Sequence, residues 1–221
     1  MRPWRTIDRV DTDEGPLELR QRGERDFLIT ISGRILMTSV AHRSEDALAQ
    51  IACAPLAGAN RPAVLVGGLG MGYTLRAALD QLPARAEVLL VDLNPAVVEW
   101  CKGPLAPLTG GAISDKRVSV QIADVARVIS AAPASRWDAV LLDLYEGPHQ
   151  ATNHTHDPLY GAAALERTAR ALRPGGVLAI WSEELDRPFE RRLDAAGFRV
   201  QIHRTRGGRS HVIYEARTTA G

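Results

Sequence analysis

One stretch limits the possible fold of this chain more than any other. Residues 64–72 read V-L-V-G-G-L-G-M-G, an apolar run that passes into a cluster of glycines and is followed by a helical pattern. The stretch predicts a buried strand, a tight turn and a helix that begins on bare backbone. Glycine at Gly67, Gly68, Gly70 and Gly72 removes the side chains that would keep a ligand away from the main chain.

A second feature stands at the end of the next predicted strand. Residues 87–91 are predicted as a strand, which ends in Asp92. An acidic residue roughly 20 positions after such a glycine turn can accept hydrogen bonds from ribose hydroxyls. The two features together predict a nucleoside-containing cofactor at the edge of a parallel sheet.

The spacing of the glycines narrows the choice of cofactor. A dinucleotide fold favours G-x-G-x-x-G, and here the third glycine position is Tyr73. The pattern found, Gly68-x-Gly70-x-Gly72, resembles motif I of class I S-adenosylmethionine (SAM) methyltransferases and of their aminopropyltransferase relatives. A nicotinamide or flavin site, and a turn that merely needs glycine, are the alternatives.

Length and charge exclude several classes of function. At 221 residues the chain is long enough for one large domain with helices on both faces of a sheet. A net charge of +1 gives no general case for binding nucleic acid or a membrane. Cys53 and Cys101 have no metal-ligand spacing, and no apolar run has the length of a signal or membrane segment. We therefore expect a cytoplasmic protein.

The first part of the chain predicts a small sheet. Residues 1–16 are polar and are expected to be a loosely ordered lead-in. Residues 17–22, 27–32 and 34–40 alternate as three short antiparallel strands. Ser44 is expected to cap the next helix. We therefore place a β-rich extension at residues 1–43 and an α/β domain at residues 44–221.

From residue 64 onward, strands and helices alternate. Strands are expected at 64–66, 88–91, 118–122, 137–142 and 177–181, helices between them, and a final hairpin at 198–205 and 211–217. Repeated β-α units imply a parallel sheet with right-handed crossovers. A mostly parallel seven-stranded sheet that closes with an antiparallel hairpin is the Rossmann-like fold of class I SAM-dependent methyltransferases.

Three carboxylates are expected at the same rim as the glycine turn. Asp92, Asp124 and Asp143 each follow a predicted strand, and the carboxyl ends of parallel strands meet at one crevice. Asp143 could act as a general base or could orient an ammonium group. The alternative for each carboxylate is that it caps a turn or a helix.

The stretch from about residue 36 to residue 181 resembles spermidine synthases and spermidine-synthase-like proteins. The family's G-G-G-D-G-G matches residues 67–72, its V-E-I-D-x-x-V-V resembles V-D-L-N-P-A-V-V at 91–98, and its D-V-I-I-x-D resembles D-A-V-L-L-D at 138–143. The resemblance implies that Asp92 binds the ribose and that Asp124 contacts the adenine amino group. It also implies that Asp143 helps to deprotonate the attacking amine.

Departures from the family pattern bear on the reaction. Gly70 stands where the synthases carry an Asp for the amino group of the aminopropyl donor, and Ser44-Glu45-Asp46 stands where they have Y-H-E. These changes favour methyl transfer from SAM to a small-molecule acceptor. The alternatives are aminopropyl transfer from decarboxylated SAM, a non-catalytic nucleoside-binding protein and, third, a nicotinamide-dependent oxidoreductase.

The predicted loop at residues 145–160 is a candidate acceptor site. Its P-L-Y at 158–160 resembles the family's L-[YF], and we expect Tyr145, Glu146 and Tyr160 to contact the acceptor. The loop's histidines match no metal-ligand motif, so no metal is expected. Exposed edges of the small N-terminal sheet suggest a homodimer.

Overall fold

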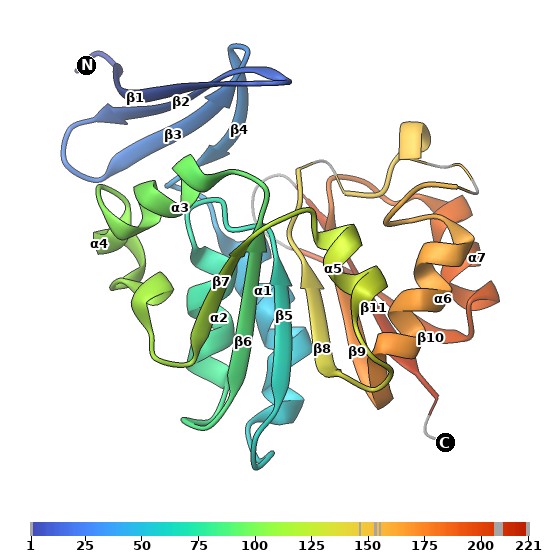
Figure 1. Ribbon diagram of the computed structural model, residues 1–221. Coiled ribbons are helices and arrows are strands. Elements are labelled where there is room, and N and C mark those ends of the chain that lie inside the picture. The colour runs from blue at the N-terminus through green and yellow to red at the C-terminus, as the bar shows by residue number, and fades with distance from the viewer. Residues whose placement is uncertain (1, 146, 153, 155, 206–209, 220–221) are drawn as a thin grey trace.

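The computed structural model describes residues 2–145, 147–152, 154, 156–205 and 210–219. A four-stranded sheet lies over one end of a seven-stranded sheet that has helices on both faces (Figure 1). The chain enters through the small sheet and ends beside the large one.

The small sheet is antiparallel and pairs in chain order. Its strands are β1 (Arg5–Thr12), β2 (Gly15–Arg22), β3 (Asp26–Ile31) and β4 (Arg34–Thr38). The prediction of a loose lead-in over residues 1–16 was wrong, because residues 5–12 pair with β2 as a full strand. The side chains of β1 are mostly exposed, so the strand lacks the apolar alternation that would reveal it.

The large sheet contains the predicted parallel strands and the predicted closing hairpin. In order of pairing its strands are β10 (Phe198–Arg204), β11 (Val212–Thr218), β9 (Leu172–Ser182), β8 (Trp137–Leu142), β5 (Ala63–Gly67), β6 (Glu87–Asp92) and β7 (Val118–Ile122). Strands β9, β8, β5, β6 and β7 run parallel to one another, and β11 runs antiparallel to both β9 and β10.

Helices connect these strands. They are α1 (Arg43–Cys53), α2 (Tyr73–Gln81), α3 (Pro95–Lys102), α4 (Ala106–Thr109), α5 (Val125–Ala131), α6 (Ala162–Ala171) and α7 (Arg187–Ala195), with 3-10 turns at Ala54–Leu56, Ala112–Ser114 and Gln150–Thr152. The side-chain oxygen of Asn94 caps α3 by accepting from the Ala96 N–H at 3.0 Å, and Pro95 takes the first helical position, as expected. Ser44 lies inside α1 and does not cap it, which corrects that prediction.

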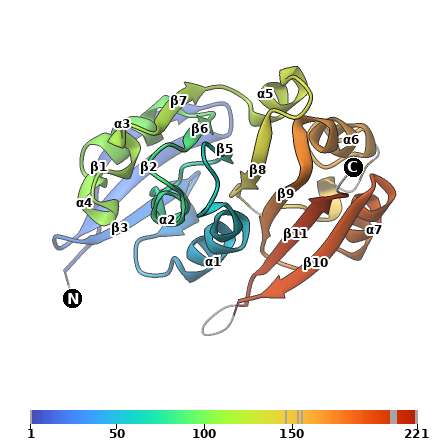
Figure 2. The same cartoon turned by 90° about the horizontal axis from the view of Figure 1, so that it is seen from below.

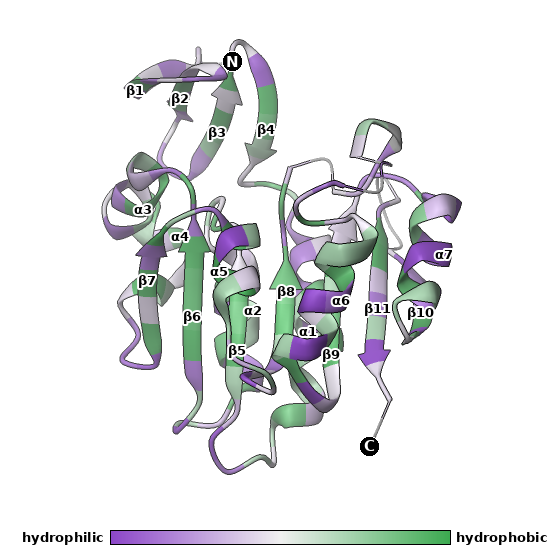
Figure 3. Cartoon of the chain, turned by 45° about the vertical axis from the view of Figure 1, so that its right-hand side comes forward, coloured by the Kyte–Doolittle hydropathy of each residue, from purple (hydrophilic) through white to green (hydrophobic). Residues whose placement is uncertain are grey.

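The core has two halves, one on each face of the large sheet. Helices α1, α2 and α3 cover one face, and α5, α6 and α7 cover the other (Figure 2). Every residue of β5 is buried, and Figure 3 shows the central strands as mostly hydrophobic along their length. Such uninterrupted apolar strands are typical of a parallel sheet covered on both sides.

The small sheet covers the carboxyl ends of the central strands. Trp100 on α3 donates its indole N–H to Asp8 of β1 at 2.6 Å. Tyr73 donates its hydroxyl to the Ser39 carbonyl at 3.0 Å, just after β4. The small sheet therefore forms a roof over the predicted site residues at the strand ends. Among the described residues, no helix has the length and apolarity needed to cross a membrane.

Candidate functional site

The glycine turn joins β5 to α2 in a conformation that needs glycine. Gly68, Gly70 and Gly72 have φ values of +90°, +52° and +85°. A Cβ atom at Gly68 would lie only 2.2 Å from the carbonyl oxygen of Asp143. At Gly67 it would lie 2.8 Å from a methyl group of Val125. The absence of side chains therefore lets β8 and α5 approach the turn closely.

Asp92 is fixed against this turn. One carboxylate oxygen accepts from the Leu69 N–H, and the other accepts from the Asn94 N–H, both at 2.8 Å. Burial raises the pKa of Asp92, and these two hydrogen bonds oppose the rise. The structure thus brings together the glycine turn and the carboxylate that the sequence predicts as partners. Contact with a ribose stays a prediction.

Met37 of β4 lies on the same turn, a contact the sequence did not suggest. The Met71 N–H points at its sulfur across 3.3 Å, and a Cβ at Gly70 would lie 2.9 Å from that sulfur. An acidic side chain at position 70 would therefore have to displace the thioether. At Gly70, where the sequence departs from the family pattern, the Met37 side chain of the small sheet fills the adjacent space.

Asp124 stands at the start of α5, after the edge strand β7. Its Oδ1 accepts from the Ala126 N–H at 2.8 Å, so it caps the helix. The backbone N–H of Ala123 donates to the Asp92 carbonyl at 3.0 Å, which keeps the two strand ends adjacent. Capping accounts for one oxygen of Asp124; contact with an adenine amino group stays a prediction.

Asp143 follows β8 and has the most unusual electrostatics in the cleft. Burial raises its pKa to about 7, and the nearby carboxylate of Glu45 adds to the rise. The Thr74 hydroxyl, on the first turn of α2, donates to Oδ2 at 2.5 Å and opposes it. A carboxylate that titrates near neutral pH suits a general base.

Glu45 is a second buried carboxylate that sequence reasoning noted only as a departure from a family motif. The Ser44 hydroxyl donates to it at 2.6 Å, and the His211 ring nitrogen Nδ1 lies 3.2 Å from the Ser44 oxygen. A signal was present: Glu45 is three positions before Leu48 and therefore shares the inward face of α1. An acidic residue on an apolar face marks a candidate site.

The three predicted acceptor contacts have different positions. Tyr145 is 44% exposed and has the Arg34 guanidinium 5.5 Å from its ring centre. Tyr160 is only 5% exposed, and its hydroxyl has no hydrogen-bond partner among the residues that the structure describes. Burial, followed by the charges of Asp157 and Asp143, raises the pKa of Tyr160. Glu146 lies outside the described residues.

The histidines of the loop have different surroundings. The His154 ring lies 3.8 Å from the Asp157 carboxylate, and His156 is exposed. In the part of the chain that the structure describes, no group of three or more His, Cys, Asp or Glu side chains is arranged to hold a metal ion.

Comparison with known families and proteins agrees with this geometry. The model of the spermine/spermidine synthase domain matches residues 45–190. Over 119 residues the chain is 33% identical to a polyamine aminopropyltransferase of Mycobacterium tuberculosis, covering 53% of this chain and 22% of that protein. Over 126 residues it is 30% identical to putrescine N-methyltransferase 3 of Nicotiana tabacum, covering 57% and 31%. The matched stretches thus span only about a fifth to a third of these relatives.

Solved structures resemble the whole chain. The spermidine synthase of Thermotoga maritima superposes with a TM-score of 0.78 at 18% identity, covering 98% of this chain and 74% of that one. A probable spermidine synthase of Corynebacterium glutamicum gives a TM-score of 0.64 at 15% identity, covering 95% and 79%. At these identities the likeness establishes the fold alone.

Proposed function

Because this chain belongs to the spermine/spermidine synthase domain family, we propose that it is a transferase with a SAM-type donor and a small amine as acceptor. Methyl transfer from SAM is the reaction we favour. Aminopropyl transfer from decarboxylated SAM is the second candidate.

The glycine turn and Asp92 suit a nucleoside sulfonium donor. A Cβ at Gly68 or Gly70 would collide with the Asp143 carbonyl oxygen or the Met37 sulfur, so glycine at both positions keeps the turn narrow beside Asp92. Each oxygen of Asp92 accepts one hydrogen bond and keeps capacity for another, as ribose hydroxyls require. Asp124 stands at the adjacent strand end. When bound, such a donor supplies a carbon activated by the positive sulfur.

The setting of Asp143, buried near Glu45 and bound by the Thr74 hydroxyl, is the observation that carries the proposal. An amine attacks only after it has lost its proton, and Asp143, with a pKa of about 7, can accept that proton near neutral pH. The hydrogen bond from Thr74 holds one oxygen of the carboxylate and leaves the other for the acceptor. In this account Asp143 is the catalytic residue and Thr74 a positioning residue.

Glu45 supplies the second negative charge of the acceptor site. It raises the pKa of Asp143, so its charge acts on the same region of the cleft. Within the described ranges, neither Glu45 nor Asp143 makes an ion pair. A positively charged amine would relieve this repulsion. Tyr145, Glu146 and Tyr160 are proposed as further acceptor contacts.

Gly70 and Met37 support methyl transfer over aminopropyl transfer. Without a carboxylate at position 70, and with the Met37 sulfur 2.9 Å from where a Cβ would stand, the cleft lacks the acidic partner expected for the amino group of an aminopropyl donor. The tobacco relative is named as a putrescine N-methyltransferase and the mycobacterial one as a polyamine aminopropyltransferase. Related sequences thus carry both reaction names.

A donor-competition assay tests the proposal. The protein is incubated with equal amounts of SAM and decarboxylated SAM and with a series of diamines and monoamines, and the products are identified by mass spectrometry. We expect methylated amines, and we expect Asp143→Asn to lose product while still binding SAM. Aminopropylated amines would establish the second candidate. Binding of SAM without any product would instead favour a non-catalytic nucleoside-binding protein.

A further inference from the structure

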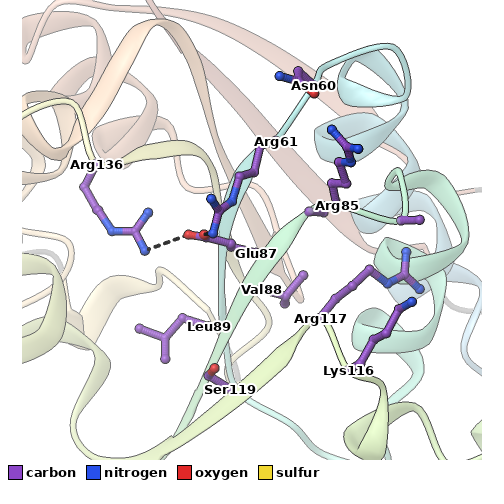
Figure 4. A pocket seen from close by; sticks show the side chains of 12 residues that line it. Asn60, Arg61, Arg85, Glu87, Val88, Leu89, Lys116, Arg117, Ser119 and Arg136 are labelled. Atoms are coloured by element: carbon purple, nitrogen blue, oxygen red, sulfur yellow. Dashed lines mark ion pairs between the residues drawn. The ribbon is translucent and has the colours of Figure 1, made fainter.

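A hollow of about 830 Å³ lies at the end of the large sheet opposite the glycine turn (Figure 4). It is formed at the amino ends of β6, β7 and β8 and by the residues that lead into β5. Five basic side chains line it, together with one carboxylate; these are Arg61, Arg85, Lys116, Arg117, Arg136 and Glu87. The proposed transferase site uses none of them.

The single lining carboxylate is shared between two arginines. Glu87 contacts the Arg61 guanidinium through one oxygen, and its other oxygen lies 3.6 Å from Arg136. Figure 4 shows both guanidinium groups converging on Glu87 from opposite sides. One negative charge cannot neutralise two positive ones, so this side of the hollow keeps a net positive charge.

Arg117 is fixed in the wall by structural contacts. It donates to the carbonyl oxygens of Leu79 and Leu82, at the end of α2, at 2.9 Å each. Asp115 neutralises it through a hydrogen bond of 2.8 Å, which raises the pKa of Arg117 further. Arg117 therefore shapes the hollow without adding unpaired charge.

Arg85 and Lys116 have no such partners. In the described chain neither side chain makes an ion pair or a hydrogen bond, although both line the hollow. With Arg117 neutralised, Arg61, Arg85, Lys116 and Arg136 face the single carboxylate of Glu87. The hollow is thus a concave, net positive surface with a partly apolar floor of Val88 and Leu89.

We propose that this hollow is a second binding site, for a small anion that carries several linked phosphate groups. Guanidinium groups match phosphate oxygens in two-point hydrogen bonds, and a lysine adds a mobile point charge. The volume suits one small molecule. The chain as a whole carries a net charge of only +1, so the wide basic surface expected of a nucleic-acid-binding protein is not implied.

The site is distinct from the donor site. Strand β6 begins at Glu87 in the hollow and ends at Asp92 in the cleft, with six residues in all. At about 3.3 Å per residue, the two ends are separated by roughly 15–20 Å. A ligand in the hollow therefore leaves the donor cleft open.

Calorimetric titration with inorganic tripolyphosphate tests the proposal, with ATP and adenosine as further ligands. We expect saturable binding of tripolyphosphate and of ATP, weakened by salt because the contacts are charged. Tripolyphosphate should bind equally well when the donor cleft is filled with SAM. Tighter binding of tripolyphosphate than of ATP would identify an inorganic polyphosphate as the ligand. Tighter binding of ATP would identify a nucleotide.

The decisive comparison uses two double variants with the same loss of charge. Arg85→Ala with Lys116→Ala should weaken tripolyphosphate binding about tenfold or more, because charged hydrogen bonds are lost. Arg191→Ala with Arg199→Ala removes two exposed arginines outside the hollow and should leave binding unchanged. Thermal unfolding and SAM binding check that both variants are folded, and Lys116→Glu alone provides an independent variant.

Three outcomes would overturn the proposal. They are no saturable tripolyphosphate binding to the unmodified chain, equal weakening in both double variants, and displacement of tripolyphosphate by a single-stranded oligonucleotide at far lower concentration. Loss of amine transfer in the assay above would leave this site unaffected, so the two proposals fail independently.

Discussion

Asp143 and Glu45 place two negative charges in one cleft, from elements almost a hundred positions apart in the chain. Each is held by a hydroxyl group, Asp143 by Thr74 and Glu45 by Ser44. Their mutual repulsion, added to burial, raises the pKa of Asp143 to about 7. The cleft therefore combines a base for a proton with an attraction for a cation.

Replacing Glu45 by glutamine should shift the pH dependence of the reaction. Since the charge of Glu45 raises the pKa of Asp143, its removal lowers that pKa. The rising limb of kcat/KM, expected at a pH of about 7 in the unmodified chain, should move to lower pH, and the KM for a cationic amine should increase. Steady-state kinetics from pH 5 to 9 provide the measurement.

The matched control is Asp46→Asn, one position further along α1. Asp46 is half-buried and pairs with His42 at 2.9 Å, and its charge is not among those that raise the pKa of Asp143. We expect its pH profile to match that of the unmodified chain. An equal shift in both variants, or none in Glu45→Gln, would contradict the role assigned to Glu45.

Asp143→Asn should stabilise the fold at alkaline pH. The pKa of Asp143 is raised from 3.8 to about 7 on folding, so the folded chain holds a proton there that the unfolded chain releases. The stabilising effect of that proton is complete below a pH of about 4 and is lost as the pH rises through about 7. Above this window the carboxylate costs the folded state up to about 1.4 kcal/mol per unit of pKa shift.

Thermal unfolding at pH 4 and at pH 8 measures this effect. The melting temperature of Asp143→Asn should exceed that of the unmodified chain at pH 8, and the difference should shrink toward pH 4. A difference in melting temperature that does not change with pH would contradict the raised pKa of Asp143.

Single positions differ in how far the sequence reveals them. Asp92, Asp124 and Asp143 could be predicted, because strand ends in a parallel sheet share one rim. Glu45 has a weaker signal, an acidic side chain on the inward face of α1, and Met37 has none. Their contacts with the strand ends depend on how α1 and the small sheet pack onto the central strands.

On the scale of elements, the residue that caps α5 is also a predicted contact of the donor. Asp124 accepts from the Ala126 N–H at 2.8 Å, and the same carboxylate is proposed to contact adenine. Asp124→Ala should lower stability by about 1 kcal/mol, the usual cost of a lost helix cap, and should weaken SAM binding. Asp124→Asn should keep the cap, because asparagine caps equally well, yet still weaken SAM binding.

Asp186 offers a matched control at the start of α7. It accepts from the Phe189 N–H at 2.7 Å, in a helix cap with no proposed role in ligand binding. Asp186→Ala should therefore cost similar stability with unchanged affinity for SAM. Denaturant unfolding and calorimetry give the two quantities. Unchanged SAM affinity in both Asp124 variants would show that Asp124 caps α5 and does not contact the donor.

The elements that the sequence predicted well are those with strong periodicity. The central strands and the closing hairpin were confirmed, because apolar runs bounded by glycine and proline have few other solutions. Strand β1 was missed, since its exposed side chains carry no alternation and its place depends on pairing with β2. The strand predicted at residues 177–181 is longer in the structure, because β9 begins at Leu172 and ends at Ser182.

On the scale of the whole molecule, the small sheet forms a roof over the candidate site. We propose the boundary between the two parts after residue 43, at the first residue of α1. Contacts from Met37, Ser39 and Asp8 to the glycine turn, α2 and α3 attach the roof to the α/β domain. The small sheet therefore covers one side of the candidate site.

A homodimer through the small sheet is a further expectation at this scale. Its edge strand β4 exposes Ile35 by 59%, and Val40 just beyond it is exposed by 74%. An edge with exposed apolar side chains favours pairing with a second copy. Sedimentation at micromolar concentration should give a dimer, and Ile35→Lys should give a monomer. A monomeric unmodified chain would exclude this expectation.

The central claim is that the rim of glycines and Asp92 binds a SAM-type donor. Calorimetric titration of the purified protein with SAM, and separately with decarboxylated SAM, tests it most directly. We expect saturable binding of SAM and weaker binding of decarboxylated SAM, because position 70 carries no acidic side chain for its amino group and Met37 fills the adjacent space. Preference for decarboxylated SAM would indicate aminopropyl transfer, and binding of neither would contradict the claim.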